Sequence, residues 1–312
     1  MDKLARRPRA PTPPADPVPD WGTRLKDLAG ILAPTTAITA LLLYFGYIGT
    51  RARFAYFGVY LDLTGLSNQD LMLYGLEVLY VPAALVLLAV LIGAAGHAAV
   101  SWLTGSPDHR RAALATAAAL LIAGVLLLAR ATIGLLVVRV SRTEIPGTSA
   151  LALAFGPILI LYAGWAAATV LVRDGTARFP RWYTGPAIVR VRRLIAVAVS
   201  GLVLVGLFWA ANSFAWAFGQ GRAMDDAGQL PYRAELLLDT KEPLVDLPPG
   251  VEETPLTGEF HHRYHGLRLL VAADDRLFLV PASWTDQART LVIPYDDQIR
   301  IQLIPPRTGV TT

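Results

Sequence analysis

The chain has 312 residues, of which 54% are hydrophobic and only 17% charged, with a formal net charge of +4. The core of a soluble protein of this length does not need so much apolar surface, so we expect much of it to face lipid. Cysteine is absent, which excludes disulfides and thiolate metal ligands.

The N-terminal residues 1–26 are rich in proline and basic side chains, and we expect them to form a disordered cytoplasmic arm. The apolar segment that follows is too long for the core of a cleaved signal peptide, so it predicts an uncleaved first helix. Five apolar segments are long enough to cross a bilayer. The predicted spans are residues 28–48, 71–96, 112–130, 149–172 and 194–218, within a transmembrane domain of residues 27–219.

Seven of the 28 aromatic residues fall between positions 44 and 60. Aromatic rings prefer the headgroup region, which favours an interfacial belt. The alternative is a short in-plane or re-entrant helix whose rings line a groove, with Arg51, Arg53 and Asp62 as polar contacts. The aromatic residues concerned are Tyr44, Phe45, Tyr47, Phe54, Tyr56, Phe57 and Tyr60.

The run YIGTRARFAYFGVYLDLTGLSNQDLMLYG, residues 47–75, resembles a segment of multi-pass membrane proteins of actinobacteria that have no assigned activity. The resemblance implies membrane class and bacterial source and supplies no site residues. Within this run, Ser67 and Asp70 have the spacing of a helix N-cap, so a helix should begin there.

Two charged side chains lie inside or at the edge of predicted spans, Glu77 and Arg130. Charge within a bilayer is costly and is usually paired or exposed to water. If the second span descends and the third rises, the two side chains lie at similar depth, and we expect an ion pair between them. The alternative is that each extends separately to the headgroups.

Arginines determine the predicted orientation of the helices. Residues 173–193 hold six arginines and one acid, and Arg190, Arg192 and Arg193 directly precede the last span. Aromatic residues interleaved with these arginines are also compatible with nucleic-acid binding. A cytoplasmic loop that lies on anionic lipid headgroups accounts for the same residues, so we expect no nucleic-acid partner. With five spans, fourteen Lys/Arg lie on the cytoplasmic side and four outside. We therefore expect a multi-pass protein of the plasma membrane with its N-terminus inside and residues 220–312 outside.

Residues 220–312 carry short apolar runs separated by turn formers, which predicts a small extracytoplasmic β-rich domain of about five strands. Leu267–Val271 and Leu277–Val280 flank a predicted hairpin turn at Asp274 and Asp275. The acid pairs 225/226 and 296/297 are interpreted as turn residues too, rather than calcium ligands. Further predicted strands are 234–238, 290–293 and 299–303.

Three of the five histidines cluster at His261, His262 and His265. On a helix, His261 and His265 would share a face and could bind a metal. The segment runs into a predicted strand, where residues four apart are about 13 Å apart, so we expect no metal site. A pH-responsive patch and an incidental surface cluster remain alternatives.

No motif for a catalytic nucleophile, a metalloprotease or a nucleotide site occurs in the chain, so we expect neither enzymatic activity nor a cofactor. Two functions fit. The first is a membrane protein that presents its external β-rich domain to an envelope partner or as a sensor. The second is a transporter or channel component using Glu77, Arg130 and the proline-broken helix at Pro157. Oligomerisation is left open.

Overall fold

The structure is a computed structural model of the chain and describes residues 21–175 and 186–306. The chain divides between Leu41 and Leu42 into two compact units. The second unit contains the packed helices and the sheet.

Four helical segments of the described part are long and apolar enough to cross a membrane. They are α2 (Asn68–Gly105), Pro107–Leu136 with α3 (Arg110–Leu136), α5 (Thr148–Arg173), and Ile188–Tyr232, formed by α6 (Pro186–Gln229) and η4 (Leu230–Tyr232). The count is four and not the predicted five. The predicted span 28–48 lies in α1 (Trp21–Tyr56), which is not among them. The side chains of residues 21–34 lie outside the described ones, and the remaining part of the predicted span, residues 35–48, is by itself too short to cross a bilayer.

The predicted N-terminal arm is only partly described. Residues 1–20 lie outside the described residues. Residues 21–26 were assigned to the arm, but they begin α1. A helix that has started in the apolar segment gains one hydrogen bond for each residue added, so it extends backward into this polar sequence, which contains no proline.

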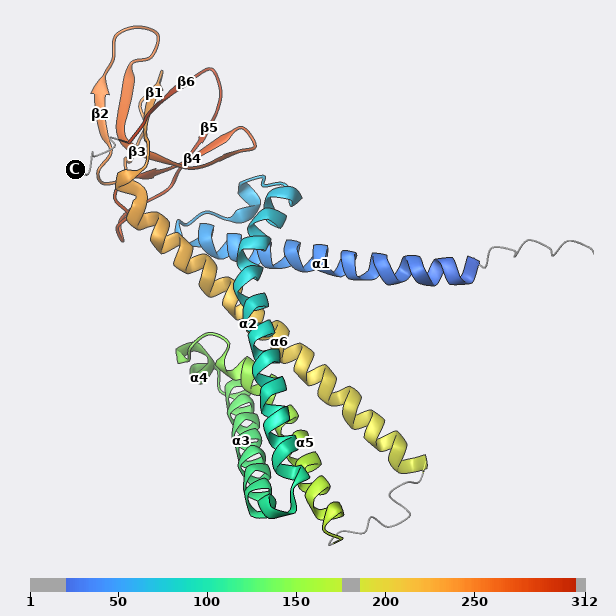
Figure 1. The fold of residues 1–312 in the computed structure, drawn as a ribbon. Coiled ribbons are helices and arrows are strands. Elements are labelled where there is room, and N and C mark those ends of the chain that lie inside the picture. The colour runs from blue at the N-terminus through green and yellow to red at the C-terminus, as the bar shows by residue number, and fades with distance from the viewer. Residues whose placement is uncertain (1–20, 176–185, 307–312) are drawn as a thin grey trace, which may run out of the picture. The chain divides into compact units, whose positions relative to one another are not determined.

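Close helix packing depends on small residues. Figure 1 shows α3 and α5 side by side, linked through the short α4 (Val138–Thr143). A Cβ added at Gly124 would lie 2.9 Å from the carbonyl oxygen of Gly156, so these two backbones touch where any larger residue would separate them. Pro157 is buried beside this contact, and α5 continues through it. Pro157 therefore occupies a buried packing position within a continuous helix.

The start of α2 has the predicted capping box. The Ser67 hydroxyl accepts the N–H of Asp70, and the Asp70 carboxylate accepts the N–H of Ser67 at 3.0 Å. These bonds satisfy donors that the first helical turn leaves without partners.

The C-terminal part is one antiparallel sheet with strand order β5-β4-β3-β1-β6, and β2 also pairs with β3 (Figure 1). Six strands occur in the described residues, against about five predicted. The strands are β1 (Glu235–Thr240), β2 (Glu252–Pro255), β3 (His262–Ala273), β4 (Arg276–Pro281), β5 (Leu291–Pro294) and β6 (Ile299–Ile304). The additional strand is β2, which lies in a proline-rich stretch that contains none of the predicted strands.

Turn residues behave as predicted at one acid pair and not at another. Asp274 and Asp275 both have φ of 53° and connect β3 to β4, as expected for a tight hairpin. Asp225 and Asp226 instead lie within α6, which extends about 16 Å beyond the predicted span end at residue 218. Asp226 is buried there.

The two faces of β4 contribute to different cores. Leu277 and Leu279 point into a core inside the sheet domain, together with Leu236, Leu238 and Tyr264. Phe278 and Val280 point to the opposite face, where helical residues cover them. Because side chains alternate along a strand, one strand serves both cores.

Candidate functional site

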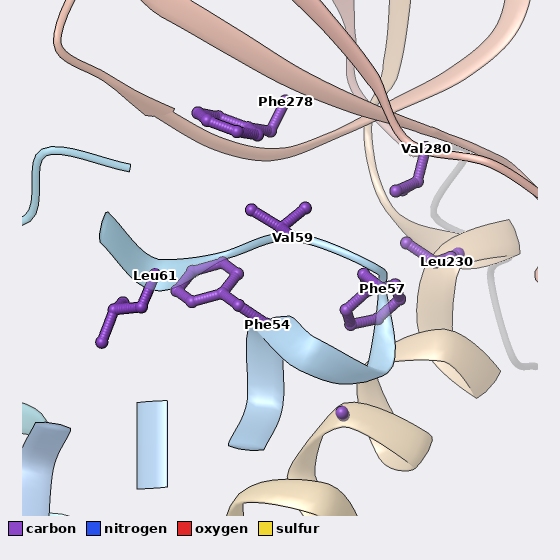
Figure 2. Close-up of a cluster of buried hydrophobic side chains, with 8 residues drawn as sticks. Phe54, Phe57, Val59, Leu61, Leu230, Phe278 and Val280 are labelled. Atoms are coloured by element: carbon purple, nitrogen blue, oxygen red, sulfur yellow. The ribbon is translucent and has the colours of Figure 1, made fainter. Parts of the chain in front are cut away.

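The sheet is attached to the helices through a shared set of buried side chains, which we call the junction cluster (Figure 2). Figure 2 shows these side chains converging from the end of α1, the segment after it, η4 and β4. Its members are Phe54, Phe57, Val59, Leu61, Ala223, Leu230, Phe278 and Val280, each no more than 7% exposed. Burying one such large apolar side chain contributes about 1.5–3 kcal/mol, so the cluster is a substantial attachment.

Aromatic and backbone contacts extend the junction to the connection between β4 and β5. The Trp284 ring meets the Phe57 ring edge-on, with centroids 4.9 Å apart and an interplanar angle of 70°. The Thr290 hydroxyl donates to the carbonyl oxygen of Phe57 at 2.6 Å. The end of α1 is thus held by the sheet domain through both apolar and polar contacts.

A buried carboxylate lies beside the junction cluster. Asp226 of α6 accepts a hydrogen bond at 2.6 Å from Nε of Arg53 in α1, and it also pairs with Arg233 just before β1. Arg268 of β3, itself 8% exposed, donates from Nε to the carbonyl oxygen of Leu230 at 2.9 Å. These bonds connect the ends of α1 and α6 to the sheet.

A second buried carboxylate lies inside the sheet. Asp239 of β1 has no exposed side-chain surface and accepts hydrogen bonds from Arg263 of β3 at 2.7 and 3.0 Å and from Arg300 of β6 at 2.7 and 3.0 Å. The hydrogen bonds from Arg263 do most to lower the pKa of Asp239 below its ordinary value, and they outweigh the opposing effect of burial. Sequence reasoning missed this group, although an acid inside the run Glu-Leu-Leu-Leu-Asp-Thr is a signal for a buried ion pair.

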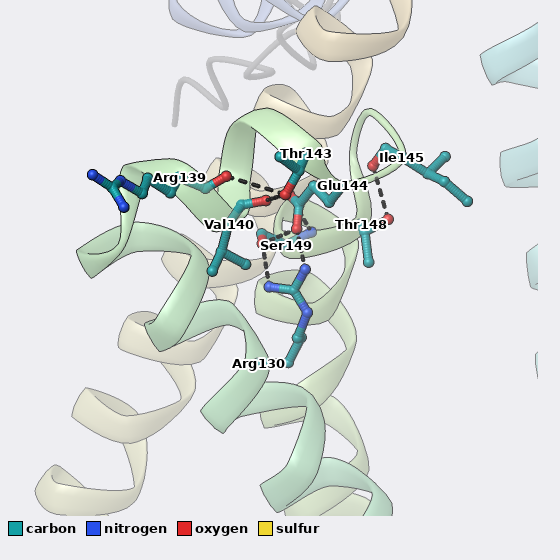
Figure 3. A network of polar contacts seen from close by, with 8 residues as sticks. All are labelled: Arg130, Arg139, Val140, Thr143, Glu144, Ile145, Thr148 and Ser149. Atoms are coloured by element: carbon teal, nitrogen blue, oxygen red, sulfur yellow. Dashed lines mark hydrogen bonds and ion pairs between the residues drawn. The ribbon is translucent and has the colours of Figure 1, made fainter.

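Polar side chains also meet between α3, α4 and α5 (Figure 3). Arg130 pairs with Glu144 and donates to the Ser149 hydroxyl at 3.1 Å, while that hydroxyl and the N–H of Ser149 donate to Glu144 at 2.8 and 3.2 Å. Burial acts to raise the pKa of Glu144, but the bonds from Ser149 and Arg130 together lower it below its ordinary value. The Glu144 side chain is 8% exposed and is fully paired within this network.

A cavity of about 290 Å³ opens next to this network. Its walls come from the segment before α5, the first turn of α5 and one face of α6. The α6 side contributes Trp209, Asn212, Ser213, Trp216 and Gln220, which recur at the spacing of one helix face. The cavity is therefore both aromatic and polar.

The predicted ion pair between Glu77 and Arg130 is wrong. Glu77 pairs with Arg222 of α6 at 2.9 Å, and Arg130 pairs with Glu144. The prediction rested on the similar depth of Glu77 and Arg130 along their helices. In the fold, Glu144 in the loop before α5 lies closer to Arg130, and Arg222 near the end of α6 lies closer to Glu77. Neither partner stands out in the sequence as an intramembrane charge.

The aromatic segment is divided between surface and core. Tyr60 is 76% exposed and Tyr44 is 39% exposed, and the Tyr44 hydroxyl donates to Asn212 at 3.2 Å. Phe54 and Phe57 are buried in the junction cluster, and Tyr47 and Tyr56 pack against it. The sheet domain thus covers two phenylalanines of this segment, and the interfacial position of the segment stays a prediction.

The histidines are separated by strand geometry. His262 pairs with Glu253 across β2 and β3 at 2.6 Å, and His265 lies opposite Glu252. Within residues 21–175 and 186–306, no group of three potential ligands is close enough to hold a metal ion. Arg190, Arg192 and Arg193 lie exposed near the start of α6.

These features define a class of protein: apolar helices able to cross a membrane, followed by an antiparallel sheet packed on helix ends. Comparison with protein-family models, with curated proteins and with solved structures finds no match. The resemblance of residues 47–75 to actinobacterial membrane proteins stays a prediction.

Proposed function

We propose that this chain is a non-enzymatic multi-pass membrane protein that holds its C-terminal sheet domain at the extracytoplasmic surface as an interaction or sensor module. The junction cluster is the observation that carries the proposal. Phe278 and Val280 are fully buried because residues of α1, α6 and the segment after α1 cover them.

A module attached in this way differs from one on a flexible linker. A partner that displaces the sheet must expose the junction cluster and separate Arg53 from Asp226. Binding energy at the sheet can therefore act on the helix ends, which a sensor or an accessory subunit requires.

The proposed orientation rests on arginines and does not depend on α1. Eight arginines lie in or beside the loops at one end of the four helices: Arg110, Arg111, Arg173, Arg178, Arg181, Arg190, Arg192 and Arg193. The opposite end, which leads into the sheet, has four arginines in its loops, Arg51, Arg53, Arg139 and Arg142, and two near the end of α6, Arg222 and Arg233. The positive-inside rule favours placing the sheet domain outside the cytoplasm of a bacterial cell.

The alternative function, a transporter or channel component, needs polar groups along the whole membrane path. In the described helices, the polar lining of the cavity beside α5 and α6 gathers at residues 209–220, near one end of α6. Glu77 and Arg222 neutralise each other beside a much smaller cavity of about 20 Å³. This distribution fits a binding pocket better than a continuous pathway.

The natural absence of cysteine makes the orientation directly testable. Gln287→Cys, exposed between β4 and β5, should react with an impermeant maleimide on intact cells, whereas Asp108→Cys, exposed between α2 and α3, should react only after permeabilisation. The opposite pattern would overturn the proposed orientation. With four spans the N-terminal arm would lie on the same side as the sheet domain, whereas a fifth span in α1 would place it in the cytoplasm as predicted. Ala10→Cys distinguishes these two arrangements in the same assay.

An interaction role also predicts a defined neighbour. A photo-crosslinker at Gln302, exposed on β6, should give a discrete adduct with one envelope protein in intact cells. The matched position is Ala115, exposed on α3, which should give none. If Gln302 yields the same pattern as Ala115, the interaction role is refuted even when the orientation is correct.

A further inference from the structure

The cavity beside α5 and α6 has no excess charge on its walls. Glu144, its acidic lining residue, has both carboxylate oxygens occupied by Arg130 and Ser149. Arg130 is committed to that carboxylate and does not line the cavity. An ammonium ligand would need a free carboxylate and a phosphate would need a free cation, so the lining selects a neutral guest.

The same walls offer hydrogen-bonding groups that the protein leaves unused. In the described structure, the side chains of Ser213 and Gln220 and the indole N–H groups of Trp209 and Trp216 make no hydrogen bond within the protein. Asn212 accepts a bond from Tyr44 through its oxygen, which leaves its two amide N–H donors available. Both donors and acceptors are thus presented on one face of α6.

Two indole rings accompany these polar groups, one helical heptad apart at Trp209 and Trp216. A guest must therefore have an apolar face for the rings and hydroxyl or amide groups for the rest of the wall. The volume of about 290 Å³ is far above the roughly 10–15 Å³ that a single water needs. A single sugar ring fits such a space and has both properties, because its C–H face is apolar and its rim carries hydroxyls.

We propose that this cavity binds a neutral sugar ring, supplied either by the headgroup of a glycolipid or by a free sugar. Such binding goes beyond the proposed function and does not depend on the sheet domain having a protein partner. The site lies toward the end of α6 that leads into the sheet, where lipid headgroups and soluble sugars both have access if the proposed orientation holds.

The test uses the full-length protein in nanodiscs of phosphatidylethanolamine and phosphatidylglycerol, with and without a minor fraction of monoglucosyl diacylglycerol. Native mass spectrometry counts the lipids that stay bound. We expect the glucosyl lipid to be retained above its share of the bilayer. Trp216→Leu and Asn212→Leu should each reduce that retention about tenfold, which corresponds to about 1.4 kcal/mol.

Two further variants separate binding from folding. Gln220→Leu changes an exposed residue of the cavity rim and should weaken retention without affecting the fold. Trp102→Leu removes an indole of α2 that is 65% exposed and outside the cavity, and it should leave retention unchanged. Equal losses in Trp102→Leu and Trp216→Leu would contradict a specific site.

A second arm distinguishes the two sources. Saturable quenching of tryptophan fluorescence by glucose, lost in Trp216→Leu, without retention of the glucosyl lipid, would identify a free sugar as the guest. Retention of the glucosyl lipid without a response to glucose would identify the lipid. The proposal is overturned if neither binds, or if phosphatidylglycerol is the lipid whose retention depends on Trp216 and Asn212.

Discussion

Removing the Phe57 ring should weaken the attachment of the sheet domain to the helices. Phe57 is 1% exposed, and its ring lies 4.9 Å from that of Trp284. Truncation of a buried phenylalanine to alanine costs about 3–5 kcal/mol. That loss is a large fraction of the stability of a small domain, which is about 5–15 kcal/mol.

A double-mutant cycle isolates the contact between the two parts. Phe57→Ala and Trp284→Ala should show a coupling of about 0.5–1.5 kcal/mol, the contribution of an edge-to-face ring pair beyond its buried area. The matched control is Leu279→Ala, because Leu279 is also buried on β4 but points into the core inside the sheet domain. Its coupling with Phe57→Ala should lie within about 0.5 kcal/mol of zero.

The assay is pulse proteolysis of the full-length protein in mild detergent across a urea series. Urea unfolds the sheet domain while the apolar helices stay in the micelle, so cleavage after residue 230 reports the unfolded fraction. If the coupling of Phe57 with Trp284 is no larger than that with Leu279, the sheet is not packed on the end of α1, and the reasoning behind the proposed function fails.

Three other features of the fold lead to predictions of their own. Asp239→Asn should destabilise the sheet by about 3–5 kcal/mol in the same urea assay, because both arginine partners lose a buried carboxylate. Because folding lowers the pKa of Asp239, this carboxylate contributes its full stability above the unfolded pKa of about 3.9, and the contribution is lost as the pH falls below that value. Asp239→Asn should reduce this pH dependence. Glu144→Leu or Arg130→Leu alone should lower the yield of folded protein in size-exclusion chromatography, and the double substitution should recover it; a double variant no better than the singles contradicts the pair. Gly219→Ala should destabilise the folded protein by about 1–3 kcal/mol, because a Cβ would collide with a backbone carbonyl of α1, and it should therefore lower the temperature at which the protein aggregates on heating. Gly221→Ala, with open space around it, should leave that temperature unchanged.

The junction also bears on how the sheet domain can be studied. Expressed without the helices, residues 222–312 would expose Phe278 and Val280, which α1 and its following segment cover in the full chain. An exposed apolar patch of this kind promotes aggregation. Experiments on the full-length protein therefore test the module in its native surroundings.

Local sequence patterns predicted much of the architecture. Long apolar runs indicated α2, α3, α5 and α6, and the spacing of Ser67 and Asp70 indicated where α2 begins. The acid pair at Asp274 and Asp275 indicated the turn between β3 and β4. These features depend on residues a few positions apart, and hydrophobic length, capping and turn chemistry act at that range.

Only the tertiary structure decided which side chains meet. Phe57 looked like an interfacial aromatic, but it is buried because a sheet more than 200 residues away packs on it, as the hydrogen bond from Thr290 shows. Arg130 pairs with Glu144 in the loop before α5, and Asp239 pairs with arginines on the neighbouring strands β3 and β6. Apolarity and charge are properties of single residues, whereas burial and pairing depend on what the folded chain brings to each one from a distance.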